Sequence, residues 1–349
     1  MSIEIPPDTI AKKRIRIEDV AREAGVSITT VSRTLNGSGY VKESTRQKIF
    51  AALEALDYRP GVVRNTIEPK TEEEKIICMV VPSIENLIFP QIIKGAEEYL
   101  RKHECILSLC NTEEDPMLAR EFIRKMRNQG AAGFLICSVE RNDRHLRIMH
   151  ENQIPAVLLN RSTEEEIYST VSVDHFQAAY DAVYYLIRSG RKKIAIASGR
   201  EELLLYEERL KGYCQALTDA GLPVREEWIM RDVSGRNGFY QKTIDLLNEP
   251  ERPDAIFCTS DPKAFVVMRA LQDQGIHIPE EIAVVGFDNV PISALVEPTL
   301  TTVSQPFHLI GETGARLLLK QIQYKEEHGV LPKASRTVMP TELIVRKST

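Results

Sequence analysis

The sequence predicts an α/β protein with a small three-helix head followed by two doubly wound parallel-sheet lobes. From residue 76 onward, strands that are apolar throughout alternate with amphipathic helices, which indicates parallel sheets covered on both faces. Residues 13–60 show helical periodicity and no strand pattern. At about 150 residues per domain, 349 residues correspond to two or three folded units.

The head is expected to hold three short helices, and residues 1–12 before it are expected to form a flexible tail. The first helix covers 18–24 and ends at Gly25, because a helix often stops where the backbone adopts a positive φ. Ser27 can cap the second helix, which runs to about Leu35. The third helix runs from Ser44 to about Leu56 and has apolar residues spaced by three and four. Residues 13–60 therefore form a helix-turn-helix domain, and a hinge or linker covers 61–75.

The body is expected to contain seven strands, and seven strands over about 210 residues fit two sheets better than one. They are 76–81, 105–110, 132–137, 154–159, 193–198, 254–259 and 281–286. The helices between them are 90–102, 116–129, 175–189, 207–220, 236–248 and 262–275. A break near 171–175 divides the body into lobe 1 (76–173 with about 305–335) and lobe 2 (174–304 with about 336–349).

Composition and motifs exclude several classes of protein. The longest apolar runs are too short for a membrane span, and MSIEIPPDTI has no signal-like pattern, so we expect a soluble cytoplasmic protein without a membrane partner. The cysteines form no CxxC pair and are interpreted as buried thiols. No GxGxxG, GxxxxGK[ST], GxSxG or HExxH motif occurs, and the seven histidines are scattered. We therefore expect no enzyme activity, no metal and no cofactor.

The head carries the pattern of a DNA-binding module. Residues 11–65 hold 11 Lys+Arg against 6 Asp+Glu, whereas the rest of the chain holds 34 against 44. In a helix-turn-helix the second helix enters the major groove, where small hydroxyls reach base edges or phosphates. Ile28 suits a thymine methyl group, and Arg33 suits guanine. The alternative is an ordinary helical hairpin with a capping serine.

Polar residues follow several strands of the body. Ligands of open α/β sheets bind beyond the carboxyl ends of the strands, and these polar groups suit a polyhydroxylated or anionic small molecule. The alternative is that they are helix caps and turn residues. They are Ser83, Asn111, Ser138, Asn160-Arg161, Ser198, Ser260-Asp261 and Asp288.

The chain resembles the LacI family of bacterial transcription regulators. The head carries Asp19-Val20-Ala21, Ala24-Gly25-Val26-Ser27, Thr30-Val31-Ser32-Arg33 and Tyr58-Arg59-Pro60. The body carries Val173-Asp174, Arg209 with Gly212-Tyr213, Gly286-Phe287-Asp288, and Pro298-Thr299-Leu300-Thr301-Thr302-Val303 with Gln305-Pro306. The resemblance covers nearly the whole chain. It implies lobes of the periplasmic-binding-protein type, a homodimer, and a pseudo-palindromic double-stranded DNA operator.

The resemblance also implies individual DNA contacts. Those expected in the head are Ser27, Ile28, Thr29, Thr30, Ser32, Arg33 and Asn36. Members of the family fold a hinge helix whose leucine enters the minor groove, and the corresponding residues here are Arg64 and Ile67. Gly61 and the glutamates at 72–74 depart from that pattern, so a differently built hinge is expected.

For the effector, the resemblance points to seven positions in the body. Ser83, Arg161, Arg209 and Asp288 match positions that line the family's effector cleft, whereas Phe89 and Phe176 either stack on the ligand or close the pocket. Ser260 stands where the family frequently has asparagine, so the effector cannot be copied from a relative. The function expected is a transcription regulator, most simply a repressor, controlled by a small-molecule effector such as a sugar or sugar phosphate.

Two alternative functions remain open. Part of lobe 2 is similar to the catabolite control protein A subgroup, whose members respond to a phosphorylated carrier protein. That subgroup has a tyrosine, an aspartate and an arginine where this chain has His308, Leu309 and Arg316, so only the arginine is kept. A phosphocarrier protein is therefore a possible partner. A solute-binding protein is the other alternative, but it has no use for a helix-turn-helix.

Overall fold

The computed structural model describes residues 17–36, 41–56, 75–141, 143–200, 202–231 and 238–349. The chain divides into two compact units, Met1–Glu73 and Glu74–Thr349, which we treat separately. We call the first unit the head and the second the body.

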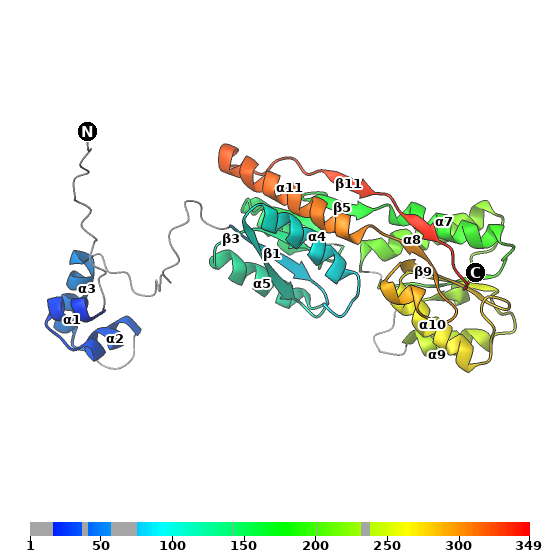
Figure 1. Cartoon of the computed structure of the whole chain (residues 1–349), viewed down its shortest axis with the longest axis horizontal. Helices are drawn as coiled ribbons and strands as arrows, with labels where there is room; N and C mark the ends of the chain where they lie inside the picture. Colours follow the sequence, from blue (N-terminus) through cyan, green and yellow to red (C-terminus); the bar gives the residue numbers. More distant parts are fainter. Residues whose placement is uncertain (1–16, 37–40, 57–74, 142, 201, 232–237) are drawn as a thin grey trace, which may run out of the picture. The chain divides into compact units, whose positions relative to one another are not determined.

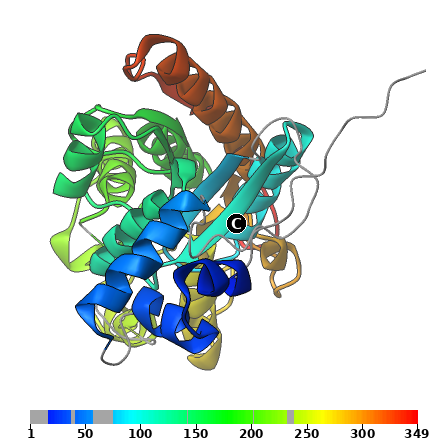
Figure 2. The same ribbon diagram turned by 90° about the vertical axis from the view of Figure 1, so that its left-hand side faces the viewer.

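The head is a three-helix unit of α1 (Ile17–Ala24), α2 (Ile28–Asn36) and α3 (Glu43–Ala55), shown in blue in Figures 1 and 2. Gly25 has a φ of 65°, and Val26 donates a backbone hydrogen bond to the Ala21 carbonyl at 3.0 Å, so a tight turn joins α1 to α2. The three helices share a small apolar core. Its buried members are Val20, Ala21, Ala24, Val31, Ile49, Ala52 and Leu53.

The body contains two six-stranded sheets (Figure 1). Sheet 1 has the order β11-β5-β4-β3-β1-β2, and its strands are all parallel. Sheet 2 has the order β12-β10-β9-β8-β6-β7, and only β12 runs antiparallel to its neighbour. The strands are β1 (Lys75–Val81), β2 (Cys105–Asn111), β3 (Ala131–Ile136), β4 (Ala156–Leu159), β5 (Ser169–Val173), β6 (Ile194–Ala197), β7 (Ile229–Met230), β8 (Ala255–Cys258), β9 (Ala283–Asp288), β10 (Thr301–Ser304), β11 (Arg336–Met339) and β12 (Glu342–Ile344).

Helices cover both faces of sheet 1. Side chains of β1 alternate: Ile77 and Met79 pack with α4 (Phe89–Lys102) and α11 (Phe307–His328), whereas Cys78 and Val80 pack with α5 (Pro116–Asn128) and α6 (Arg144–Glu151). Because successive side chains of a strand point to opposite faces, a strand buried on both faces is apolar throughout. This explains the continuous apolar pattern of the predicted strands.

Sheet 2 is covered in the same way. The helices α7 (His175–Arg188) and α8 (Leu204–Asp219) pack on one face, and α9 (Gly238–Leu247) and α10 (Asp261–Asp273) pack on the other. Short helical turns, η1 (Glu226–Trp228) and η2 (Pro291–Ala294), complete the lobe. Within the described residues, no helix is long and apolar enough to cross a membrane.

The chain passes between the lobes three times, after β5, after β10 and after β11. The last crossing corrects one predicted boundary. Residues 336–339 form β11, which pairs with β5 in sheet 1, so they do not belong to lobe 2 as the sequence suggested. Only β12 and the residues after it join sheet 2.

All seven predicted strands are present, as β1, β2, β3, β4, β6, β8 and β9. The sequence did not reveal five further strands, which are β5, β7, β10, β11 and β12. It also did not reveal α6, whose short apolar pattern contributes only Leu146 and Met149 to the core.

The contact between α4 and α11 gives a test of the packing of lobe 1. A Cβ atom at Gly311 would lie 2.0 Å from the carbonyl oxygen of Ile92, and one at Gly95 would lie 1.9 Å from that of His308. Backbone atoms cannot move away cheaply, so Gly311→Ala should lower the free energy of unfolding by about 1–3 kcal/mol. Urea denaturation of the purified protein measures this, with Lys320→Ala at an exposed position of the same helix as control. Equal stability of the two variants would contradict the close helix contact.

Candidate DNA-binding face and effector cleft

The second helix of the head presents a mixed polar and apolar face to solvent. Val31 is fully buried and Thr34 nearly so, which orients the opposite side of α2 outward. Ile28 at the start of this outward side is 47% exposed, so its side chain is accessible to a thymine methyl group. The predicted DNA contacts on this helix are all exposed or half-buried. They are Ser27, Ile28, Thr29, Thr30, Ser32 and Arg33.

Hydroxyl groups order the start of this helix. The Ser27 hydroxyl accepts a hydrogen bond from the Thr30 amide at 3.2 Å and shares another with the Thr30 hydroxyl at 2.8 Å. Ser27 therefore caps α2, as the sequence predicted. The cap orders the N-terminus of α2, the end that would approach the phosphates. The Asn36 side chain, Arg64 and Ile67 lie outside the described residues, so those three predicted contacts stay predictions.

In the body, a pocket opens between the lobes at the carboxyl ends of the strands. Its walls come from loops after β1, β2, β3 and β4 in lobe 1 and from the segment between β6 and α8 in lobe 2. The residues that line it are Pro82, Glu114, Pro116, Ser138, Val139, Glu140, Asp143, Arg161, Arg200 and Leu203. The pocket lies beyond the carboxyl ends of the strands, where the sequence predicts a cleft, and of the seven predicted effector residues Arg161 lines it.

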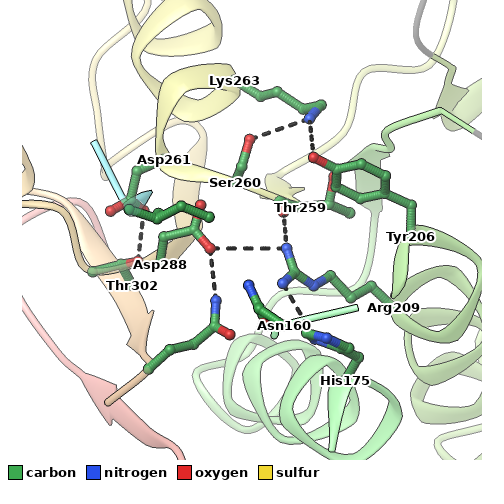
Figure 3. Close-up of polar contacts among 12 residues, drawn as sticks. Asn160, His175, Tyr206, Arg209, Thr259, Ser260, Asp261, Lys263, Asp288 and Thr302 are labelled. Atoms are coloured by element: carbon green, nitrogen blue, oxygen red, sulfur yellow. Dashed lines mark hydrogen bonds and ion pairs between the residues drawn. The ribbon is translucent and has the colours of Figure 1, made fainter. Parts of the chain in front are cut away.

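Deeper between the lobes lies a buried arginine. Arg209 of α8 is only 2% exposed, and its guanidinium donates to the Thr259 carbonyl and to Nδ1 of His175 at 3.2 Å (Figure 3). The guanidinium also lies 3.6 Å above the centre of the Phe287 ring, and Nη1 is 4.0 Å from the Asp288 carboxylate. A carbonyl, an imidazole, a ring and a carboxylate thus surround one cation.

These contacts fix the tautomer of His175. A guanidinium only donates hydrogen bonds, so Nδ1 of His175 must accept, and Nε2 carries the proton that it can donate to the Ser172 hydroxyl at 3.2 Å. Complete burial lowers the pKa of His175 well below its usual value, and the nearby Arg209 and Arg161 lower it further. His175 is therefore a neutral hydrogen-bond partner that orients Arg209.

Figure 3 shows two carboxyl groups in this cluster, Asp288 beside the arginine and Asp261 beyond it. Asp288 accepts a hydrogen bond from the Gln305 amide at 2.7 Å, and Asp261 accepts from Thr302 at 2.6 Å and from the Val290 amide at 2.8 Å. Burial raises the pKa of both groups, and repulsion from Asp288 raises that of Asp261 further.

Asp288 also has a backbone φ of 122°, a conformation that an L-residue adopts only at a cost of about 1–3 kcal/mol. Strained residues of this kind cluster at ligand sites.

Electrostatic compensation in this cluster is incomplete. Burial lowers the pKa of Arg209 although Asp288 opposes the shift, and burial raises the pKa of Asp288 although Arg209 opposes it. For each charged group, the hydration free energy lost on burial therefore exceeds the stabilisation that its oppositely charged partner provides. Four buried polar atoms nearby also have no hydrogen-bond partner among the described residues. They are Oδ1 of Asn160, Nε of Arg161, Nε of Arg209 and Oε1 of Gln305.

Comparison with known proteins agrees with both sites. Residues 16–61 match the family model described as bacterial regulatory proteins of the lacI family, and residues 74–337 match the model of periplasmic binding proteins and the sugar binding domain of the LacI family. The chain belongs to the LacI family. As a LacI-family protein it is a DNA-binding transcription regulator with an effector-binding body.

Individual relatives match over nearly the full length. Catabolite control protein A of Priestia megaterium is 34% identical over 88% of this chain and 92% of its own. The transcriptional repressor PurR of Photobacterium profundum is 31% identical over 95% and 98%. Among solved structures, the transcriptional regulator CelR–cellobiose complex superposes with a TM-score of 0.71 at 28% identity, over 96% of this chain and 100% of that one.

The structure of this LacI-family chain brings three of the predicted effector residues into one cluster. Arg209 and Asp288 form its centre, and Ser260 follows Thr259 directly and accepts a hydrogen bond from Lys263 at 3.2 Å. Arg161 lines the cleft.

The remaining three predicted effector residues lie elsewhere. Ser83 is half-buried, and its hydroxyl accepts a hydrogen bond from the Glu85 amide at 3.2 Å. Phe176 is half-buried next to Tyr180, with ring centroids 6.5 Å apart. Phe89 is 1% exposed inside the lobe 1 core, so its ring has no free face on which a ligand can stack. The structure thus corrects the stacking role considered for Phe89.

The sequence did not single out several residues of the cluster. His175 directly follows a family motif and Gln305 is part of one, but neither was expected to contact the effector. Lys263 donates to the hydroxyl of Tyr206 at 3.4 Å, and Tyr206 packs so closely on Gly199 that a Cβ there would lie 2.4 Å from its ring. In the sequence, only the glycine at position 199 indicates that a side chain such as that of Tyr206 packs there.

Ion pairs join the lobes at the mouth of the cleft. Arg200 of lobe 2 reaches Glu114 at 3.0 Å and Glu140 at 3.7 Å in lobe 1. In the opposite direction, Arg141 of lobe 1 forms an ion pair with Glu207 in lobe 2. We call these two arginines and their three partners the interlobe clasp. Both arginines are about one-third exposed, so salt weakens the clasp more than it weakens the buried cluster.

Removing the clasp should open the cleft. Exposed ion pairs contribute about 0.2–1 kcal/mol each, so losing all three pairs in the double variant Arg141→Ala, Arg200→Ala should shift the equilibrium between closed and open lobes by roughly threefold to 150-fold. Fluorescence energy transfer between one label on α5 and one on α9 measures the shift, and 1 M salt should reproduce it in the wild type. Arg101→Ala removes an ion pair within lobe 1, with Glu97 at 2.9 Å, and is the control. Identical transfer in all three proteins would rule out the clasp.

Proposed function

We propose that this LacI-family regulator is a repressor whose operator affinity changes when a sugar or sugar phosphate binds between its lobes. The observation that carries the proposal is the set of four buried, unpartnered polar atoms around Arg209. Buried polar groups in native proteins nearly always have a partner, so these atoms indicate a polar ligand. The similarity to a regulator in complex with cellobiose and to a repressor supports both parts of the proposal.

The chemistry of the cluster favours hydroxyl groups. The two unpartnered arginine nitrogens only donate hydrogen bonds, whereas the unpartnered oxygens of Asn160 and Gln305 accept them. A sugar hydroxyl serves both because it donates and accepts. Arg161 at the cleft wall is placed to pair with a phosphate, since planar guanidinium groups bind phosphate oxygens in pairs.

The mechanism we propose is a shift between two lobe arrangements. An effector bound to both lobes favours the closed arrangement by as much as its affinities for the two arrangements differ. In a homodimer this changes the spacing of two heads, which must match two half-sites of a pseudo-palindromic operator. Because the operator is bacterial DNA, we place the working protein in the cytoplasm.

Exposed apolar side chains suggest where the dimer forms. β2 is an edge strand of sheet 1, and its residues Ile106 and Leu109 are 50% and 44% exposed. Leu295, after η2 in lobe 2, is 80% exposed. Such side chains gain most when a partner covers them, so we propose that these elements and the start of α4 contribute to the interface.

A phosphorylated carrier protein remains the alternative controller, because catabolite control protein A is among the similar relatives. Arg316 is exposed, and His308 pairs with Glu98 at 3.0 Å. Of the three positions that the catabolite control protein A subgroup uses, one thus holds an arginine for a phosphate, while the buried cluster holds four unsatisfied atoms, and this difference favours the small molecule. The match of residues 16–61 to a DNA-binding family speaks against a solute-binding protein.

The head provides a direct test of operator reading. Arg33→Ala should weaken binding to the selected operator by about 1–3 kcal/mol if Arg33 forms two hydrogen bonds to a guanine. Fluorescence anisotropy with operator and scrambled duplexes at several salt concentrations measures the loss. Arg22→Ala removes the same charge from α1, where Arg22 pairs with Asp19 at 3.4 Å, and should reduce binding to both duplexes equally. A uniform loss in Arg33→Ala would mean a phosphate contact only.

The cleft is tested by calorimetry with a panel of sugars and sugar phosphates that includes cellobiose. Arg209→Ala should bind the active compound more than tenfold more weakly, because a hydrogen-bonded cation is lost from a desolvated site. Operator binding without effector should persist, which also shows that the variant folds. Arg188→Ala, at an exposed arginine of α7, is the control. A panel without any binder would contradict the effector class, and wild-type affinity in Arg209→Ala would remove Arg209 from the site.

A further inference from the structure

A second concave surface lies on lobe 1, between α5 and α6. It is a groove of about 610 Å³ on the face of sheet 1 opposite to α4 and α11. Residues of both helices line it, and none of them belongs to the Arg209 cluster. They are Asp115, Met117, Leu118, Arg120, Glu121, Ile123, Arg124, Arg127, Asn128, His145, Ile148, Met149 and Ile154.

The groove is apolar at its floor and at its two edges. Ile123, Met149 and Ile154 form the floor and belong to the core under α5 and α6. At the edges, Met117 of α5 is 67% exposed and Ile148 of α6 is 54% exposed. Large apolar side chains exposed on both sides of a groove are typical of a binding surface.

Positive charge surrounds this apolar strip. The two helices carry six Arg and Lys residues against two glutamates, although the whole chain has a net charge of −5. Lys125 pairs with Glu121 at 2.6 Å, and Arg147 pairs with Glu165. Neither Arg124 nor Arg127 forms an ion pair with a described residue, and both are exposed beside the groove.

Two nitrogen atoms of the groove wall also lack partners. Nε of Arg120 and Nε2 of His145 are buried, and neither has a hydrogen-bond partner among the described residues. The Arg120 atom is a donor, so it requires an acceptor from outside. A molecule that fills this groove must therefore offer acceptor oxygens and apolar groups together.

We propose that this groove binds an acidic amphipathic helix of a partner protein. α5 has 13 residues and is therefore about 20 Å long, enough to lie along a partner helix of about three turns. Leucine-like side chains of the partner would cover Met117 and Ile148, and its carboxylates would pair with Arg120, Arg124 and Arg127. A duplex gains nothing from the apolar edges, and a flat bilayer does not reach the floor of a concave groove.

The groove adjoins the effector cleft, so a partner bound in the groove can affect residues that line the cleft. Nη2 of Arg120 lies 3.8 Å from the Asp143 carboxylate, and Asp143 lines the mouth of the cleft. A partner carboxylate that pairs with Arg120 competes with Asp143 for this cation. The partner helix would therefore bind next to the clasp residues of lobe 1, which are Glu114, Glu140 and Arg141.

The test is photo-crosslinking in cells with the full chain. A benzoylphenylalanine at Met117 or Ile148 should form an adduct with another protein, and mass spectrometry should map it to a segment with acidic and apolar residues on helical spacing. A probe at Val224, which is 41% exposed on lobe 2, is the control. The double variant Arg124→Glu, Arg127→Glu should lose at least nine-tenths of the adduct, whereas Arg188→Glu on lobe 2 should keep it.

The mapped segment, made as a labelled peptide, should bind the purified chain at least tenfold more weakly in the double variant than in Arg188→Glu. Operator binding by both variants shows that they fold. The proposal is wrong if Met117 and Ile148 give no adduct beyond that of Val224. An adduct to a second copy of this chain, to lipid, to nucleic acid or to a segment without acidic residues also overturns it, as does an adduct that charge reversal leaves intact.

Discussion

The buried charge of Arg209 is the constraint on which the body of this protein depends. A guanidinium that is only 2% exposed must replace its hydration with protein groups, and here lobe 2 supplies them as the Thr259 carbonyl, the His175 imidazole and the Asp288 carboxylate. His175 follows the first crossing between lobes, and Gln305, which positions Asp288, precedes the second. Both groups thus lie next to segments that join the lobes. Because the compensation remains incomplete, the effector we propose would complete it with its oxygens and so stabilise one lobe arrangement.

Two layers of electrostatics hold the cleft, and they respond to different conditions. The inner layer around Arg209 is buried, so salt screens it little, and only a ligand or a proton changes it. The outer layer is the interlobe clasp, whose arginines are about one-third exposed and therefore sensitive to ionic strength. In the mechanism we propose, the effector acts on the inner layer, while the outer layer sets the lobe equilibrium that the effector must shift. A weak outer layer keeps both arrangements populated, which a switch requires.

The sequence predicted the elements that are strongly apolar and missed those that depend on neighbours. Strands such as β1 are buried on both faces and show this in their composition. β5 (Ser169–Val173) and β10 (Thr301–Ser304) are short and rich in hydroxyl residues, and they become strands because an established strand pairs with them. Likewise Arg209 and Asp288 were predicted, but His175 was not, since its role arises from a distance of 3.2 Å to a residue 34 positions away. For Phe89 the sequence left two roles open, and the structure excludes stacking on a ligand because the ring packs into the lobe 1 core.

Ser260 connects the departure from the family pattern to the chemistry of the effector. A serine is shorter than the asparagine common at this position, and Lys263 donates to its hydroxyl at 3.2 Å. The ammonium group also lies 4.4 Å above the Tyr206 ring, and its charge opposes the rise in the pKa of Asp288, so it is close to the cluster. Beside the serine hydroxyl, which both donates and accepts, Lys263 thus adds a cation that only donates hydrogen bonds. Acceptor oxygens, above all anionic ones, gain most from this cation, so within the effector class we propose we expect a sugar phosphate rather than an uncharged sugar.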